Sequence, residues 1–266
     1  MSDDRRGEIG EAFVEFVEVM RRLRAPDGCP WDRAQTLETL KTYVIEEAYE
    51  VLDAIDSGRP ELLKEELGDL LLQVLFQAQI LAEQGDFDIA DVCRGTVRKL
   101  VSRHPHVFGT EAKAKDADEV LNRWEGYKRK EGRGVLAGVP NTLPALLMAL
   151  RVSEKVRSVG FDWPTIQGAI DKLDEEVAEL KAAIAGGDKE EIRSELGDVL
   201  FTVANLARIQ SIDPEEALRG MLARFKARFE HIERRLAEQG LQVAGTPLST
   251  LDALWEEAKR GGMPEL

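Results

Sequence analysis

Apolar residues recur with the period of amphipathic helices along almost the whole of this 266-residue chain. Within residues 9–23, one helical stripe collects Ile9, Phe13, Phe16, Val17, Met20 and Leu23. Segments that alternate apolar and polar residues, as a half-buried strand would, are scarce. The pattern therefore predicts an all-α fold, with helices at about residues 9–23, 36–56, 60–84, 88–102, 117–130, 143–158, 166–185, 189–211, 214–239 and 249–260.

A stretch rich in glycine interrupts the helical pattern near the middle of the chain. It runs from Gly132-Arg133-Gly134 to Gly138-Val139-Pro140, and such compositions are common between domains. The chain length suits two small domains. We therefore predict a helical domain at residues 1–131, a linker at 132–142 and a second helical domain at 143–266.

One pattern of acidic residues occurs twice, with the same spacing in each half of the chain. The first copy is Glu46, Glu47, Glu50, Glu66 and Asp69, and the second is Glu175, Glu176, Glu179, Glu195 and Asp198. Neighbouring residues repeat as well, since the segment at 67–69 (Leu-Gly-Asp) recurs at 196–198. A gapless repeat of this kind predicts two related helical domains, each with one acidic cluster.

The spacing within each copy indicates a metal site. Residues three apart share one helix face, and a short turn makes consecutive helices antiparallel neighbours. Carboxylates that converge in this way repel one another and need a counter-ion. Because all the donors are hard oxygens, Mg²⁺ is favoured, with Mn²⁺ as the alternative. The predicted metal ligands are Glu176, Glu179, Glu195 and Asp198, with a second metal site at Glu47, Glu50, Glu66 and Asp69.

A solvated acidic face is the alternative, because the chain contains 50 Asp and Glu residues. Two observations favour metal sites. Asp69 and Asp198 each open an apolar run, at 70–76 and 199–201, and acids beside such runs are usually paired or bind metal when they are buried. The whole pattern is also duplicated.

Cationic and aromatic residues accompany the acids in each half. They come in pairs four residues apart: Trp124 with Lys128, Trp255 with Lys259, Lys99 with Arg103, and Arg224 with Arg228. An acidic cage, a basic helix face and an aromatic–lysine pair are the parts that a metal–triphosphate site needs. Taken singly, each pair has a simpler explanation, because a tryptophan commonly belongs to a core and a basic pair to a surface.

Composition narrows the class of protein further. The net charge of −14 argues against a nucleic-acid partner, but it does not exclude a nucleotide that arrives with its metal. The two cysteines, Cys29 and Cys93, form no CxxC motif, and we expect them to be reduced and packed, as in the cytoplasm.

The start of the sequence lacks the apolar region of a signal peptide. The longest apolar run, 70–82, contains three Gln and is too short to span a membrane.

Six segments of the sequence carry a family resemblance. They are 28–32 (GCPWD), 46–55 (EEAYEVLDAI), 65–70 (EELGDL), 103–108 (RHPHVF), 159–163 (VGFDW) and 195–198 (ELGD). This ordered set, which extends over nearly the whole chain, resembles the MazG nucleoside triphosphate pyrophosphohydrolases of the all-α NTP pyrophosphatase superfamily.

The resemblance implies Mg²⁺-dependent hydrolysis of NTPs and dNTPs to the monophosphate and pyrophosphate. It implies an all-α fold of two related helical domains, a homodimer, and catalysis in the C-terminal domain. Transferred by motif, the metal ligands are the four acids of the second copy, and the nucleotide contacts are Lys172, Arg224, Arg228, Trp255 and Lys259. Arg224 stands where the family pattern has lysine. Whether the cell uses such an enzyme to remove aberrant nucleotides or to restrain alarmone signalling is not encoded in these motifs.

A mechanism follows from these parts. The acid-bound metal binds the triphosphate and positions a water, which attacks the α-phosphorus. Glu175 lies one helical step from the ligand face and is the candidate to orient or deprotonate this water. Arg224, Arg228 and Lys259 are expected to stabilise charge on the leaving pyrophosphate.

The two copies differ at positions that bear on activity. Tyr43 aligns with Lys172, and Phe76 aligns with Asn205. The first copy thus lacks a cation and a polar group. Asn205, inside an apolar helix, is either a satisfied core amide or a nucleotide contact. We expect the second half to carry the hydrolysis and the first half to be structural, with a regulatory nucleotide site as the alternative.

Two rival functions stay open. The first is another enzyme of the superfamily, such as a phosphoribosyl-ATP or dUTP pyrophosphohydrolase; the two-domain layout and segment 103–108 argue against it. The second is a helical scaffold or metal-responsive binder without turnover; the complete acid set in both halves argues against that.

Overall fold

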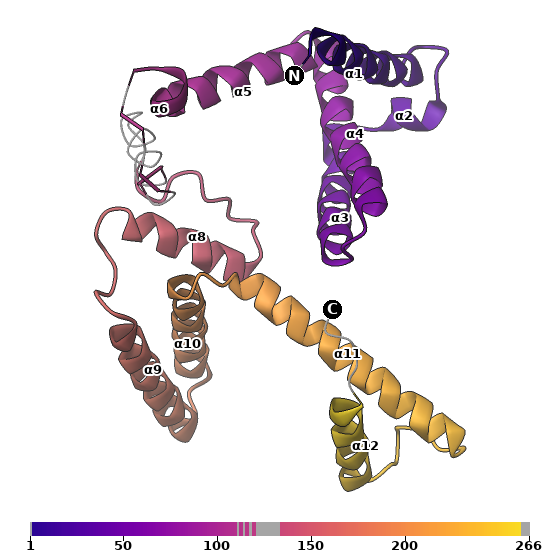
Figure 1. The fold of residues 1–266 in the computed structure, drawn as a ribbon. Helices are drawn as coiled ribbons and strands as arrows, with labels where there is room; N and C mark the ends of the chain where they lie inside the picture. Colours follow the sequence, from indigo (N-terminus) through magenta and orange to yellow (C-terminus); the bar gives the residue numbers. More distant parts are fainter. Residues whose placement is uncertain (1, 111, 114, 117–118, 121–133, 262–266) are drawn as a thin grey trace. The chain divides into compact units, whose positions relative to one another are not determined.

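The computed structural model describes residues 2–110, 112–113, 115–116, 119–120 and 134–261 (Figure 1). All regular structure within these residues is helical, which confirms the predicted all-α class. The chain forms two compact units, residues 1–113 and 114–265. Most of the helix predicted at 117–130 and the start of the linker predicted at 132–142 lie outside the described residues, so the predicted domain boundary stays a prediction.

The first unit is built around an antiparallel pair of long helices. Its helices are α1 (Asp3–Leu23), α2 (Pro30–Ala34), α3 (Leu37–Asp56), α4 (Pro60–Gln84), α5 (Ile89–Arg103) and α6 (Pro105–Phe108). Helices α3 and α4 pack along each other, and α1 and α5 contact α4. The core between α1, α3 and α4 consists of Met20, Leu40, Leu75, Phe76 and Ile80.

The second unit repeats the long antiparallel pair. Its helices are α8 (Ala145–Arg157), α9 (Ile166–Gly186), α10 (Lys189–Ile209), α11 (Pro214–Glu238) and α12 (Leu248–Arg260). Helices α9 and α10 form the pair, α8 packs on α10, and α12 packs on α11. A separate small core of Ile232, Leu236 and Leu254 joins α11 to α12. Two similar hairpins, α3–α4 and α9–α10, are the architecture that the sequence repeat predicts.

Short turns bring the paired helices back alongside each other. After α3, Gly58 has φ +64°, and Pro60 opens α4. After α9, Gly187 has φ +80°, a left-handed conformation that favours glycine. Asp188 then caps α10 by accepting hydrogen bonds from the backbone N–H groups of Glu190 and Glu191. These turns fix the antiparallel arrangement on which both acidic clusters depend.

The structure departs from the sequence prediction in three local features. Helix α1 begins at Asp3 because the side chain of Ser2 caps it. The short helices α2 and α6 were not predicted; each begins with a proline and is too short to show helical periodicity. Cys93 is exposed rather than packed. Among the described residues, no helix is long and apolar enough to cross a membrane.

Candidate metal and nucleotide site

Helices α9 and α10 bring three of the four predicted ligands of the second copy together. One carboxylate oxygen each from Glu176, Glu179 and Glu195 lies within 4.8 Å of the others. Glu176 is only 6% exposed, whereas Glu179 faces solvent. Asp198, one turn beyond Glu195 on α10, is exposed and lies outside this closest group. Its negative charge nevertheless acts on Glu195, so the fourth predicted ligand borders the cluster.

The electrostatics of this cluster favour a bound cation. Burial, followed by the negative charges of Glu179, Asp198 and Glu176, raises the pKa of Glu195 above its ordinary value. A divalent cation would remove this repulsion, and a donor set made only of carboxylate oxygens fits Mg²⁺ or Mn²⁺. The residues present therefore suit the metal that the sequence analysis predicts.

Lys172 provides a cation beside the acids. Its Nζ lies 2.8 Å from Oε1 of Glu175 and 2.8 Å from Oε1 of Glu176, and these two partners raise the pKa of the ammonium group. Glu175 is exposed and is not part of the clustered carboxylates. Lys172 therefore links a candidate metal ligand to the candidate base.

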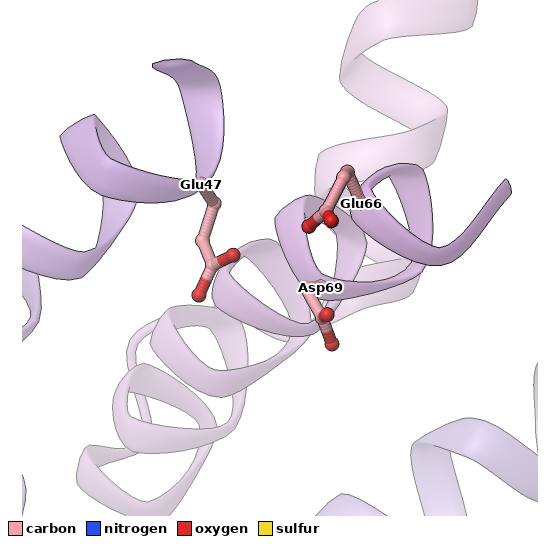
Figure 2. A group of neighbouring side chains, drawn as sticks. All are labelled: Glu47, Glu66 and Asp69. Carbon is pink, nitrogen blue, oxygen red and sulfur yellow. The ribbon is translucent and has the colours of Figure 1, made fainter. Parts of the chain in front are cut away.

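The first copy forms an equivalent cluster on α3 and α4 (Figure 2). Oxygens of Glu47, Glu66 and Asp69 lie within 4.8 Å of one another. Glu50, the fourth predicted ligand, interacts with Glu47 and raises the pKa of its carboxyl group, though less than burial does. The structure thus brings together three of the four acids that the sequence analysis predicts as second metal ligands, with Glu50 at their border.

Gln73 is a residue of this first cluster that the sequence analysis missed. Its Nε2 donates a hydrogen bond to Oε1 of Glu47 at 3.3 Å, and its side chain is 6% exposed. A glutamine one helical turn after Asp69, inside an apolar run, was the available signal.

Most of the predicted nucleotide contacts gather on α11 and α12. The guanidinium group of Arg228 lies over the ring of Trp255, 5.5 Å from its centroid, and the ring of Phe225 is 5.0 Å from the same indole. Trp255 packs against the small core of this unit and stays half-buried. Its ring therefore contributes to the core while part of its surface remains exposed to solvent. Lys259 and Arg224 are exposed. Phe225 was not predicted.

Within this one chain, the aromatic–cationic group and the acidic cluster are separate. Helix α12 packs on α11, and Figure 1 shows it beside the C-terminal half of α11, away from α9 and α10. Of the five predicted nucleotide contacts, only Lys172 therefore touches the acids. The corresponding pair in the first half, Trp124 and Lys128, lies outside the described residues.

Asn205 takes part in a buried network at the end of α10. Its Oδ1 accepts a hydrogen bond of 2.8 Å from Arg208, whose side chain is 5% exposed and also pairs with Asp162. This arrangement supports the interpretation of Asn205 as a satisfied core amide. The network ties the loop between α8 and α9 to the helix that carries Glu195.

Sequence comparison detects the same duplication. A family model described as the MazG nucleotide pyrophosphohydrolase domain matches residues 35–108 and again residues 165–233. Each match contains one complete acid set.

Similar proteins cover nearly the whole chain. A Thermotoga maritima protein named nucleoside triphosphate pyrophosphohydrolase/pyrophosphatase MazG is 44% identical over 256 residues, which is 96% of this chain and 98% of that protein. The nucleoside triphosphate pyrophosphohydrolase of Escherichia coli K12 is 42% identical over 92% of this chain and 96% of its own length. YabN of Bacillus subtilis, described as uncharacterised, is 43% identical over 93% of this chain but only 51% of its own length.

Proposed function

This chain belongs to the MazG nucleotide pyrophosphohydrolase family, and on that premise we propose that it hydrolyses nucleoside and deoxynucleoside triphosphates to the monophosphate and pyrophosphate. The reaction would occur in the second unit and depend on Mg²⁺, with Mn²⁺ as a substitute. The observation that carries the proposal is the convergence of Glu176, Glu179 and Glu195 within 4.8 Å, next to the ammonium group of Lys172.

The metal ligands would be Glu176, Glu179, Glu195 and Asp198. When bound there, the ion would neutralise charge on the phosphate oxygens and on the attacking water. The protein's own contribution is to hold these acids at the junction of two helices, so that the ligands are in place before substrate arrives.

Lys172 and Glu175 would act on the reacting atoms. A triphosphate oxygen offers Lys172 a stronger partner than an exposed carboxylate does, so substrate would draw the ammonium group away from Glu175. The freed carboxylate could then take a proton from the water that attacks the α-phosphorus. The bond from this phosphorus to the bridging oxygen breaks, and pyrophosphate leaves with the negative charge.

We further propose that the working enzyme is a homodimer. Helices α10 and α11 expose many large apolar side chains: Leu196, Leu200, Phe201, Val203, Leu218, Met221, Leu222, Phe225 and Phe229. Apolar surface of this extent is typical of protein interfaces. A second copy of the chain would cover it.

The dimer would also complete the site. Arg228, Trp255 and Lys259 lie away from the acids of their own chain, yet a triphosphate bound by the acids needs further cations and a surface for its base. A second copy that packs against α10 and α11 could bring its α11–α12 group to these acids. Arg224, Arg228 and Lys259 would then neutralise the leaving pyrophosphate from across the interface.

A cytoplasmic location is part of the proposal, because nucleoside triphosphates are found there. Cys29 and Cys93 are both free, which is compatible with a reducing compartment.

Pyrophosphate release from full-length protein tests the function. With ATP and Mg²⁺ we expect pyrophosphate and AMP in equal amounts, and no product after chelation of the metal. Glu176→Gln should abolish release, and Glu190→Gln, an exposed acid on α10 paired with Arg193, is the matched control. Binding of ATP without product would contradict the proposal. A panel containing dUTP and phosphoribosyl-ATP separates the other superfamily activities, since a strong preference for either would assign the chain to them.

A further inference from the structure

A tryptophan at the start of α9 lies at one end of the face that carries the acids. Trp163 belongs to the loop between α8 and α9, and its indole ring packs on Gly168 in the first turn of the helix. A Cβ atom at Gly168 would lie only 2.9 Å from Cδ1 of this ring, whereas carbon atoms in contact are about 3.5–4.0 Å apart. The glycine thus allows the indole to lie directly on the helix backbone.

Gly168 is on the same side of α9 as residues of the candidate site. Positions 168, 172, 175 and 179 are separated by four, three and four residues, a spacing that places them in one stripe along a helix. The stripe consists of Gly168, Lys172, Glu175 and Glu179. Since each residue of a helix adds about 1.5 Å, Gly168 and Lys172 are about 6 Å apart along the axis. The ring of Trp163 therefore continues this stripe one turn beyond Lys172.

The loop that carries Trp163 is held by a buried arginine. Nη2 of Arg208, whose side chain is 5% exposed, donates a hydrogen bond to Oδ1 of Asp162, and Asn205 accepts from the same guanidinium group at 2.8 Å. Oδ1 of Asp162 also accepts a hydrogen bond of 2.9 Å from the backbone N–H of Trp163. A short chain of hydrogen bonds thus connects the position of the indole to α10.

The first unit also places a tryptophan near the corresponding helix position. Trp31, in the segment before α3, contacts the ring of Tyr43, with the two centroids 6.1 Å apart. Tyr43 stands where the second unit has Lys172. The indole of the first unit therefore has an aromatic partner, whereas the indole of the second unit lies one turn from a cation that can bind a phosphate.

The indole of Trp163 is available to a ligand. Its side chain is only partly buried, and within the described part of the chain it belongs to neither of the two buried core clusters. An aromatic ring beside a cationic group can hold a nucleotide, because the ring stacks on any base while the cation binds the phosphates. Trp163 and Lys172 are arranged in this way along α9.

We propose that Trp163 is the residue on which the base of the nucleotide stacks, in the same chain whose acids and Lys172 hold the phosphates. This inference rests on the proposed hydrolysis site and adds the contact that recognises the base there. The α11–α12 group of a second copy would cover the remaining surface of the nucleotide. Because a larger ring system offers a larger stacking area, purine triphosphates should bind more tightly than pyrimidine triphosphates.

The test compares a nucleotide with a ligand that has no base, by isothermal titration calorimetry of full-length protein with Mg²⁺. The nucleotide is α,β-methylene-ATP, which cannot be cleaved at the α-phosphorus, and the other ligand is inorganic triphosphate. Trp163→Ala should weaken binding of the nucleotide at least about fivefold and change binding of inorganic triphosphate by less than about twofold. Trp163→Phe, which keeps a ring, should recover most of the lost affinity.

Further variants separate recognition of the base from folding. Gly168→Ala displaces the indole from the helix backbone and should weaken nucleotide binding with the same selectivity. Trp31→Ala removes the exposed tryptophan of the first unit and should leave both affinities unchanged. Thermal unfolding of each variant establishes that it folds.

Two results would overturn the inference: no loss of nucleotide affinity in Trp163→Ala, or an equal loss for nucleotide and inorganic triphosphate, which a purely structural role would give. Pyrophosphate release from ATP is measured on the same preparations. A selective loss of nucleotide affinity in a protein that releases no pyrophosphate would contradict the proposed hydrolysis and leave this inference standing. Normal release without a selective loss would do the reverse, and absence of nucleotide binding to the unaltered protein would overturn both.

Discussion

Lys172 donates to the buried carboxylate of Glu176, one helical turn further along α9, at a distance of 2.8 Å. This contact gives a carboxylate that is 6% exposed an ionic partner, so the ammonium group supplies the interaction that water would otherwise give. The acid is thus ready to bind a metal, and the lysine is ready to bind a phosphate.

The acids of the second cluster should be essential for turnover. Glu176→Gln, Glu179→Gln, Glu195→Gln and Asp198→Asn should each abolish nearly all pyrophosphate release, because each removes one of the four proposed metal ligands. The fold should survive, since loss of like-charge repulsion is not itself destabilising. Near-normal release from any two of these variants, measured at saturating Mg²⁺, would mean that the reaction occurs elsewhere.

The aromatic–cationic group should act on substrate rather than on metal. Trp255→Ala and Lys259→Ala should each weaken kcat/KM by about 1–3 kcal/mol, the range for a lost stacking or charge-assisted contact. Binding of metal without nucleotide should be little changed. Unaltered kinetics in both variants would leave Trp255 with a purely structural role.

A shared site predicts complementation between two impaired chains. Protein with Glu176→Gln, mixed with protein carrying Trp255→Ala and Lys259→Ala, should regain activity, because one arrangement in the mixed dimer pairs intact acids with an intact α11–α12 group. Each variant alone, treated identically, is the control. Mixed dimers that form but stay inactive would show that each chain uses its own group.

The two halves should contribute unequally. Glu47→Gln with Glu50→Gln should leave most of the activity, whereas Glu176→Gln with Glu179→Gln should leave almost none, because only the second cluster has Lys172 beside it. Rates are compared in full-length protein. Comparable losses from both pairs would indicate two working sites or tight coupling between them.

Arg24 makes the stability of the first unit depend on pH. Its guanidinium group donates to Glu83 on α4 at 2.8–3.2 Å, which lowers the pKa of that carboxyl group. A lowered pKa stabilises the folded state above the unfolded pKa, about 4.3 for Glu, and this stabilisation is lost as pH falls through the folded pKa.

Near neutral pH, Glu83→Gln should therefore reduce the free energy of unfolding by about 1 kcal/mol, a charged hydrogen bond discounted for the exposure of Glu83. In urea unfolding followed by circular dichroism, the difference from the unaltered protein should shrink in acid. Glu18→Gln, an exposed partner of Arg21 on α1, should change stability by less than about 0.5 kcal/mol. A difference that grows as pH falls would have the wrong sign for this explanation.

The helices could be predicted well from the sequence because the residues that begin and end each helix lie next to it in the chain. The turn at Gly58 and Pro60 and the cap at Asp188 can be recognised in the sequence, and the repeated spacing of the acids placed two hairpins with converging carboxylates. The long helices begin and end within a few residues of their predicted bounds, except for the start of α1.

The features that could not be predicted from the sequence depend on contacts between residues that are far apart in the chain. The hydrogen bond from Gln73 to Glu47 and the pairing of Arg208 with Asp162 join residues on different elements, and no spacing rule predicts such pairs. The separation of Trp255 from Glu176 within one chain was equally hidden, because it depends on the direction in which α11 leaves α10.

Each acidic cluster is built on two consecutive helices joined by one short turn, and this has a consequence for how the protein is made. The contacts that close the first cluster all lie within α3 and α4, so their sequence separation is small and their entropy of closure is low. As the chain leaves the ribosome, the α3–α4 hairpin can assemble before any residue of α9 has been synthesised. A segment whose contacts are this local can keep its fold when it is duplicated within a gene, which is compatible with the presence of two such hairpins in one chain.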